Sequence, residues 1–333
     1  MAEPTTRIAD PIRAGLAAGW DVVDASRLAA DLAIEADVAI VGSGAGGGVA
    51  AETLALAGLK VVVLEEGPLR SSTDFRMREA EAYPELYQES AARKTTDKAI
   101  NILQGRCVGG GTTVNWTSSF RTPPATLAYW TRTLGIPGLE GDALAPWFAK
   151  MEARLGIAPW EIAPNANNAT LARGAAKLGI SSGTIRRNVR ACWNLGYCGM
   201  GCPTNAKQSM LITTLPAALA RGAKLVTRVR AERLVVAGDR IVRLDAVALD
   251  AGGTTPTARR VTVRARAYVA AGGAIGTPAL LMRSNLPDPD GLVGKRTFLH
   301  PTVVSAALMP DRVDGYAGAP QTIYSDHFLD TLP

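Results

Sequence analysis

The sequence predicts an α/β fold in which a doubly wound parallel sheet is interleaved with a smaller α+β domain. Two observations support this prediction. Residues 37–65 read as a strand, a glycine-rich turn, a helix and a second strand, and residues 267–284 read as a strand that runs into a glycine pair and a helix. Strands that alternate with helical segments are typical of parallel sheets, because parallel neighbours need a crossover connection.

The first segment has the glycine spacing of a dinucleotide-binding turn. An apolar run ends at Gly42, and Gly44 and Gly47 complete the pattern G-x-G-x-x-G before the helical stretch begins. In such a turn the first glycine allows the reversal, the second lets the backbone approach a pyrophosphate, and the third brings the helix close to the strand. The next apolar run ends at Glu65, where an acidic residue binds the ribose hydroxyls. The segment therefore predicts a Rossmann-like unit for FAD or NAD, and Glu65 disfavours NADP.

Two further segments favour FAD over NAD as the cofactor. The second glycine loop, GRCVGGGTTVNW at residues 105–116, has three consecutive glycines where another backbone or a flat ring must come close. In AYVAAGGAIGTPALLMRS, residues 267–284, Thr277 and Pro278 open a helix after the glycine pair. A nicotinamide enzyme does not need both segments, so together they favour FAD.

With these motifs the chain resembles the glucose-methanol-choline (GMC) family of FAD oxidoreductases, from about residue 37 to near its end. The constrained positions of the family's first signature are matched by Gly105, Arg106, Val108, Gly109, Gly110, Gly111, Thr112, Val114 and Asn115. The second signature is matched by Gly273, Ala274, Thr277, Pro278, Leu280, Leu281 and Ser284. The chain departs from it at Asn285, where the family has glycine.

The resemblance implies hydride transfer to flavin from the CH–OH group of an alcohol, a sterol or a sugar. It places the first glycine turn and Glu65 at the ADP half of FAD and the second glycine loop along the isoalloxazine ring. Val229 is the expected adenine contact, with Ala231 as the alternative. The cofactor-binding residues that we expect are Gly42, Gly44, Gly47, Glu65, Gly105, Arg106, Gly109, Gly110, Gly111, Thr112, Asn115, Val229 and Gly273.

The same resemblance divides the chain into interleaved domains. Residues 36–125 and 215–300 are expected to form the Rossmann-like FAD-binding domain. Residues 126–214 and 301–333 are expected to form part of a smaller substrate (cap) domain, which includes a strand over residues 302–308. Residues 1–35 remain as an N-terminal extension, for which the apolar pattern predicts a helix over residues 27–34 with Ser26 as its N-cap.

Three cysteines form a separate cluster. Cys192, Cys198 and Cys202 are spaced C-x5-C-x3-C, and some family members that pass electrons to a cytochrome hold a three-iron cluster on similarly spaced cysteines. These residues are therefore candidate iron–sulfur ligands. The alternative is a structural loop of free thiols, with or without a disulfide. Cys107 lies at a variable position of the second glycine loop and is expected to be a small buried residue.

Alcohol oxidation needs a base for the hydroxyl proton, and histidine is the usual choice because it titrates near neutral pH. The chain has two histidines, His300 and His327. In GMC enzymes the base is a histidine in the C-terminal portion of a considerably longer chain, where it is paired with a second histidine or an asparagine. His300 matches instead a His-Pro element at the edge of the FAD domain, so we expect a structural role for it, with catalysis as the alternative. The chain thus reads as an N-terminal portion that stops before the base.

Composition excludes several other classes of function. The net charge of +6 is spread along the chain without the basic, aromatic-interleaved patch of a nucleic-acid reader. No uncharged apolar stretch reaches the roughly 20 residues that a membrane span needs. The N-terminus lacks the pattern of a secretory signal, which favours a cytoplasmic location.

Three functions are consistent with the sequence. The first is a flavoenzyme that oxidises a small-molecule alcohol and passes electrons to a quinone, to oxygen or to an electron-acceptor protein such as a cytochrome. The second is a noncatalytic FAD-binding fragment or subunit that needs a complementing C-terminal segment. The third, a NAD-dependent dehydrogenase, is disfavoured by the second glycine loop and the Thr-Pro motif.

Overall fold

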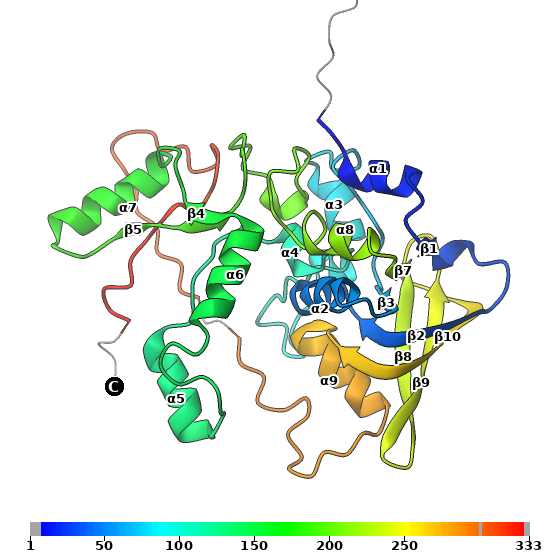
Figure 1. The fold of residues 1–333 in the computed structure, drawn as a ribbon. Helices are drawn as coiled ribbons and strands as arrows, with labels where there is room; N and C mark the ends of the chain where they lie inside the picture. Colours follow the sequence, from blue (N-terminus) through cyan, green and yellow to red (C-terminus); the bar gives the residue numbers. More distant parts are fainter. Residues whose placement is uncertain (1–7, 300–301, 330–333) are drawn as a thin grey trace, which may run out of the picture. The chain divides into compact units, whose positions relative to one another are not determined.

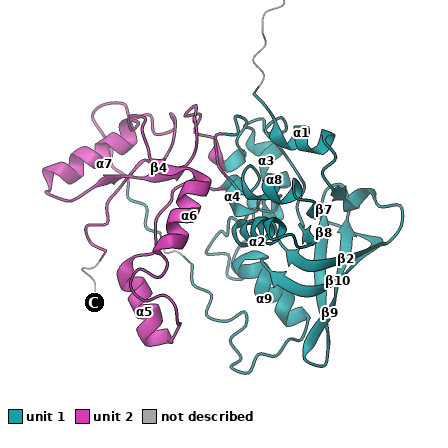
Figure 2. Ribbon diagram, in the orientation of Figure 1, with its two compact units in different colours: residues 1–114, 199–205, 209–305 teal, residues 115–198, 206–208, 306–333 magenta. Residues whose placement is uncertain are grey.

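The computed structural model describes residues 8–299 and 302–329 (Figure 1). The chain divides into two compact units (Figure 2). Unit 1 consists of residues 1–114, 199–205 and 209–305, and unit 2 of residues 115–198, 206–208 and 306–333.

Unit 1 is built on a mixed seven-stranded sheet with the order β1-β7-β3-β2-β10-β9-β8. Its strands are β1 (Val22–Asp24), β2 (Leu32–Val41), β3 (Val61–Leu64), β7 (Lys224–Thr227), β8 (Val229–Ala237), β9 (Arg240–Leu249) and β10 (Pro256–Ala270). The five strands from β1 to β10 pair in parallel, as the glycine-turn segments predict. The prediction of a parallel sheet is wrong for the pairs β10–β9 and β9–β8. Both pairs are antiparallel, because short hairpin connections join β8 to β9 and β9 to β10, so that β9 runs opposite to the other strands.

The helices of unit 1 are α1 (Pro11–Ala17), α2 (Ala45–Leu56), α3 (Glu79–Leu86), α4 (Gly111–Val114), α8 (Thr214–Leu219) and α9 (Gly273–Arg283). Helix α2 packs on β2, β3 and α8, whereas α9 packs on β8. A buried apolar core joins the central strands to the hairpins and to α9; it includes Ala39, Val62, Leu64, Val226, Leu234, Leu244, Val261, Val263 and Leu280. Short 3-10 helices lie at Ala25–Arg27, Gln88–Ala91 and Cys198–Met200.

In the described part of the expected N-terminal extension, residues 8–35, strand β1 and the first part of β2 join the sheet of unit 1. Strand β1 pairs with β7 at one edge of the sheet, and the helix predicted over residues 27–34 is wrong. The end of that segment is instead the start of β2, where Leu32 and Ile34 pair with β10. An isolated helical pattern of eight residues is weak, so the backbone pairing and burial that the sheet offers decide the conformation.

Unit 2 combines helices with small sheets, as expected for an α+β domain. It contains α5 (Pro124–Leu134), α6 (Ala145–Leu155) and α7 (Ala166–Lys177). Strand β4 (Ile157–Pro159) pairs with β6 (Arg186–Asn188), and β5 (Gly183–Thr184) pairs with β11 (Ile323–Tyr324), both antiparallel. The strand predicted over residues 302–308 is absent from the described structure, in which Val303, Val304 and Leu308 are exposed and have no strand to pair with.

No helix in the described ranges has the length and apolar character to cross a membrane.

Candidate cofactor-binding site

The predicted site residues of unit 1 gather at the carboxyl ends of three neighbouring parallel strands. Gly42 follows β2 and its N–H donates to Leu64 O at 2.8 Å, while Ala271 follows β10 and its N–H donates to Val41 O at 2.8 Å. Glu65 follows β3 in the same way, with its N–H bonded to Val226 O at 2.8 Å. This edge of an open parallel sheet is where such folds bind ligands.

The three motif glycines have different roles in the first turn. Gly42 has a φ of +97°, and a Cβ there would collide with the carbonyl oxygen of Ala271. A Cβ on Gly47 would collide with the carbonyl oxygen of Gly42 and would lie 3.3 Å from Ile40 Cγ2. The fold itself therefore requires glycine at both positions.

Gly44 is different, because the fold leaves space beside it. Its backbone is in an extended conformation that any residue adopts (φ −70°, ψ −159°), and a Cβ there would approach only Gly110 Cα, at 3.8 Å. The described fold therefore does not itself require glycine at this position. A pyrophosphate in that space fits the observation.

Two helices begin at this edge with uncapped N-termini. Helix α2 starts after Gly44 and α9 starts after Gly272, and no side chain caps either first turn. Their N–H groups and positive dipole ends are suited to an anionic group. The donor set at this edge therefore fits the diphosphate of a dinucleotide.

Glu65 is buried, with 6% of its surface exposed, and its carboxylate is already bonded to the protein. Oε2 accepts from Ser43 N at 3.0 Å and from Ser43 Oγ at 2.6 Å, and Oε1 accepts from Gly67 N at 2.9 Å. Burial raises the pKa of the Glu65 carboxyl, and these hydrogen bonds act in the opposite direction. Contact of Glu65 with a ribose stays a prediction.

Ser43 is a residue that the sequence motif does not single out. Its Oγ, which donates to Glu65, also accepts from Gly109 N at 3.0 Å, so it links the first glycine turn to the second glycine loop. The only signal in the sequence is a small polar residue at an unconstrained position of the motif. Its partner lies 66 residues away, which explains why the motif alone does not reveal it.

The second glycine loop lies against the first turn. A Cβ on Gly110 would lie 2.8 Å from Gly44 Cα, and one on Gly105 would lie 2.7 Å from the carbonyl carbon of Gly110. Gly109 and Gly110 both have positive φ angles, +88° and +54°. Gly111 has open space where a side chain would be, with no atom within 4 Å. The glycine triplet predicts that another group comes close to this loop. On the side of Gly110 that group is the backbone of the first glycine turn.

Four more residues that we expect to bind the cofactor lie in unit 1: Arg106, Thr112, Val229 and Gly273. The Arg106 guanidinium is buried and donates to the Gly253 carbonyl, and Thr112 Oγ1 donates to Gly109 O and accepts from Met210 N, so both side chains have structural partners. Val229 is buried and its N–H donates to Glu65 O at 3.1 Å, which places it beside the acidic residue. Gly273 has a φ of +79° at the start of α9.

Asn115 belongs to unit 2, unlike the other expected cofactor residues. Its Oδ1 accepts from Thr117 N at 3.3 Å, and its backbone carbonyl accepts from Lys207 Nζ at 2.7 Å.

The four cysteines form no disulfide bond within the described residues. Cys107 is 1% exposed, which confirms the expected burial. The sulfur atoms of Cys192, Cys198 and Cys202 contact Asn194 N, Arg187 Nη2 and Thr204 Oγ1, at 3.4, 3.7 and 3.4 Å. Within the described residues no three His, Cys, Asp or Glu side chains are grouped so that they could hold a metal ion. The structure therefore gives no support to the candidate three-iron cluster.

The candidate base His300 lies outside the described residues. His327 belongs to unit 2 and is exposed, and its Nδ1 lies 3.3 Å from both the N and the Oγ of Ser181.

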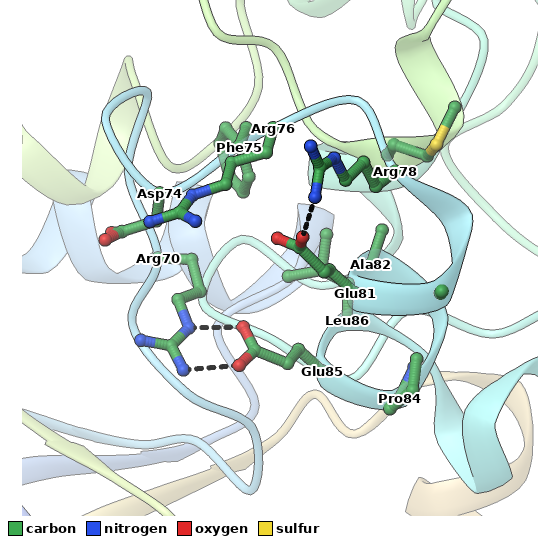
Figure 3. A pocket seen from close by; sticks show the side chains of 12 residues that line it. Arg70, Asp74, Phe75, Arg76, Arg78, Glu81, Ala82, Pro84, Glu85 and Leu86 are labelled. Carbon is green, nitrogen blue, oxygen red and sulfur yellow. Dashed lines mark hydrogen bonds and ion pairs between the residues drawn. The ribbon is translucent and has the colours of Figure 1, made fainter.

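A separate pocket of about 360 Å³ in unit 1 lies between the segment before α3, the helix itself and Met200 (Figure 3). Four of its charged side chains form two ion pairs. Arg70 binds Glu85 through two hydrogen bonds of 2.6 and 2.7 Å, and Arg78 lies 3.3 Å from Glu81. No residue of the two glycine segments lines this pocket, so it is not part of the candidate cofactor site.

Comparison with known proteins defines the class. A profile of the GMC oxidoreductase family matches residues 83–302, and a profile of the FAD binding domain matches residues 37–83. The chain belongs to the GMC oxidoreductase family, and its N-terminal region is an FAD-binding one.

Among its relatives is a long-chain-alcohol oxidase of Arabidopsis thaliana, 32% identical over 292 residues that cover 86% of this chain and 38% of the relative. Another is an uncharacterised GMC-type oxidoreductase of Mycobacterium tuberculosis, 36% identical over 299 residues that cover 89% of this chain and 46% of the relative. The chain thus spans less than half the length of either relative.

Two solved structures share the fold. Pyridoxine 4-oxidase from Mesorbium loti superposes with a TM-score of 0.57 at 21% identity, over 75% of this chain and 52% of that one. Formate oxidase from Aspergillus oryzae superposes with a TM-score of 0.53 at 16% identity, over 78% of this chain and 48% of that one.

Proposed function

We propose that this chain binds FAD at the glycine-lined edge of unit 1 and serves an oxidoreductase that takes a hydride from the CH–OH group of an alcohol. The observation that carries the proposal is the space beside Gly44, next to two uncapped helix N-termini, in a chain of the GMC family. FAD, when bound, supplies the hydride acceptor for this reaction.

The chain's own residues prepare the site in distinct ways. Gly42 and Gly47 shape the first turn, and the N–H groups at the start of α2 and α9 bind the diphosphate. Ser43 ties Glu65 to Gly109 and so fixes the second glycine loop relative to the first turn. Glu65 and Val229 lie together where the ribose and the adenine are proposed to bind.

We further propose an alcohol as the substrate, with long-chain alcohols as the first compounds to test. Four of the relatives, at 29 to 32% identity, are long-chain-alcohol oxidases. Sterols and sugars remain alternative CH–OH donors. Oxygen, a quinone or an acceptor protein would then take the electrons from the reduced flavin.

A second candidate function is FAD binding without turnover by this chain alone, with the base provided by a complementing segment. It is favoured by the position of His327, the one histidine in the described ranges, which is exposed and bonded to Ser181. The two candidates agree on the cofactor and differ on the reaction.

The test is to load the purified protein with FAD, exclude oxygen, and add alcohols of increasing chain length while the absorbance of oxidised flavin is followed. We expect alcohols to bleach the flavin and an artificial acceptor to restore it. FAD binding without bleaching, followed by bleaching when the C-terminal half of a long-chain-alcohol oxidase is supplied, favours the second candidate. Reduction by NADH but by no alcohol in either case contradicts the proposed reaction.

A further inference from the structure

Another cavity of unit 1, of about 810 Å³, lies on the strands β8, β9 and β10, which are side by side in Figure 1. Its volume is in the range of small-molecule sites, roughly 300–1,000 Å³. No residue of the two glycine segments lines it, so it is separate from the candidate cofactor site. The charged lining consists of four arginines and two carboxylates: Arg230, Arg233, Arg260, Arg283, Glu232 and Asp245.

Strand register brings these side chains together on one face of the sheet. Arg230 of β8 and Arg260 of β10 both pair with Val247 of β9, from its two sides, and Arg233 of β8 pairs with Asp245 of β9. Side chains of paired residues project to the same face, and so do those of residues two apart in one strand. The three strands therefore present their arginines to the same side.

Both carboxylates of the cavity already have an arginine partner. Glu232 Oε2 accepts from Arg260 Nη1 at 2.8 Å. Asp245 accepts two hydrogen bonds, of 2.6 and 3.0 Å, from Arg243, which does not line the cavity. Neither carboxylate is therefore left to balance the charge of the other arginines.

Three of the four arginines keep donors that no described residue accepts. Arg230, which is half-buried, and Arg233, which is exposed, have no ion pair and no side-chain hydrogen bond among the described residues. Arg283 of α9 donates from Nη2 to Ala231 O at 3.2 Å and from Nε to Glu232 O at 3.3 Å. These bonds fix its guanidinium at the cavity and leave Nη1 without an acceptor in the described structure. Because like charges on one face of a sheet repel one another, a bound anion would stabilise this arrangement.

The lining also limits the class of anion. It has no aromatic side chain on which a nucleic-acid base would stack, and its apolar residues, Ala246 and Val261, are too small to hold a lipid tail. Arginine forks bind phosphate and carboxylate groups through paired hydrogen bonds.

We propose that this cavity binds a small polyanion, an oligophosphate or a polycarboxylate, through Arg230, Arg233 and Arg283. The site goes beyond the proposed function, because none of these residues belongs to the glycine-lined edge at which FAD is proposed to bind.

The experiment is isothermal titration calorimetry of FAD-saturated protein with inorganic tripolyphosphate and, separately, with citrate. We expect a micromolar Kd for at least one of them at about 0.15 M salt. The anion that binds more tightly identifies phosphate or carboxylate as the group that the site prefers. Arg230→Gln and Arg233→Gln should each raise this Kd about tenfold or more, because each removes a hydrogen bond between charged groups.

The matched control is Arg240→Gln, which removes an exposed arginine at the start of β9 that does not line the cavity. Arg240 precedes Asp245 by roughly 16 Å along the strand, about two Debye lengths at physiological salt. The substitution removes the same charge as the test variants and should change the Kd by less than about twofold.

If a glutamine variant fails to fold, Arg230→Lys or Arg233→Lys takes its place, because lysine keeps the charge and lacks the fork, and it should still weaken binding. The inference is overturned if neither anion binds, or if the Kd is millimolar and rises as much in Arg240→Gln as in Arg233→Gln. That second result would indicate diffuse attraction to a basic surface. A wild-type protein that binds no FAD would overturn the proposed function alone, since the comparison of the arginine variants is then made on the cofactor-free protein.

Discussion

Glu65 is the residue whose ionisation is most closely coupled to the shape of the site. Its carboxylate is bonded to the first turn at Ser43 and to Gly67, in a buried environment that raises its pKa. A carboxyl with a raised pKa in the folded state binds its proton more tightly there than in the unfolded chain. The stability from this proton is complete below the unfolded value of about 4.5 and is lost as the pH rises through the higher folded value.

Glu65→Gln should therefore flatten the dependence of stability on pH. As the pH rises above about 4.5, we expect the free energy of unfolding of the cofactor-free wild type to fall by more than that of the variant, because glutamine does not ionise. Urea titrations at several pH values give this comparison. Glu35→Gln, a substitution of an exposed residue on β2, serves as the control and should keep the wild-type slope. Equal slopes for wild type and Glu65→Gln would argue against burial as the cause.

Local spacing predicts the motif residues but not their long-range partners. The G-x-G-x-x-G pattern predicts Gly42, Gly44 and Gly47 because each requirement is imposed within one turn. Ser43 is missed, since its role depends on Gly109, which lies 66 residues away in the sequence.

The strands show that backbone pairing, more than local composition, decides whether a segment forms a helix or a strand. Strands β2, β3 and β10 are predicted from apolar runs next to glycine turns, and the structure confirms them. The segment at residues 27–34 reads as helical in isolation, yet Leu32 and Ile34 pair with β10. The antiparallel β8 and β9 likewise follow from hairpin connections that the predicted crossover pattern does not include.

The hairpin of β8 and β9 should contribute to the core of unit 1 through its inward face. Leu244 on β9 is fully buried in that core, whereas Val242 on the same strand is 44% exposed. Leu244→Ala should cost about 2–5 kcal/mol in the free energy of unfolding, because it removes buried methyl groups and leaves a cavity. Val242→Ala should cost less than about 1 kcal/mol. Chemical denaturation measures both, and equal costs would contradict the placement of β9.

At the scale of the whole molecule, cofactor binding should stabilise the chain through unit 1. A ligand that binds only the folded state adds about 2.7 kcal/mol at a concentration of 100 times its Kd. We expect FAD, and not NAD, to raise the melting temperature in a thermal scan, since the chain belongs to an FAD family. An equal rise in melting temperature with NAD would indicate that the first glycine turn alone determines which dinucleotide binds.

The central claim is that the space beside Gly44 holds the FAD diphosphate. It is tested most directly by the Kd for FAD of Gly44→Ala and of Gly46→Ala, measured by flavin fluorescence. Both substitutions fit the cofactor-free fold, because an added Cβ would come no closer than 3.8 Å to Gly110 Cα or 3.9 Å to Ala271 Cβ. We predict an increase in Kd of at least about a hundredfold, or about 2.8 kcal/mol, for Gly44→Ala, and near wild-type binding for Gly46→Ala, which occupies an unconstrained position of the motif. Wild-type affinity in a folded Gly44→Ala protein would contradict the claim.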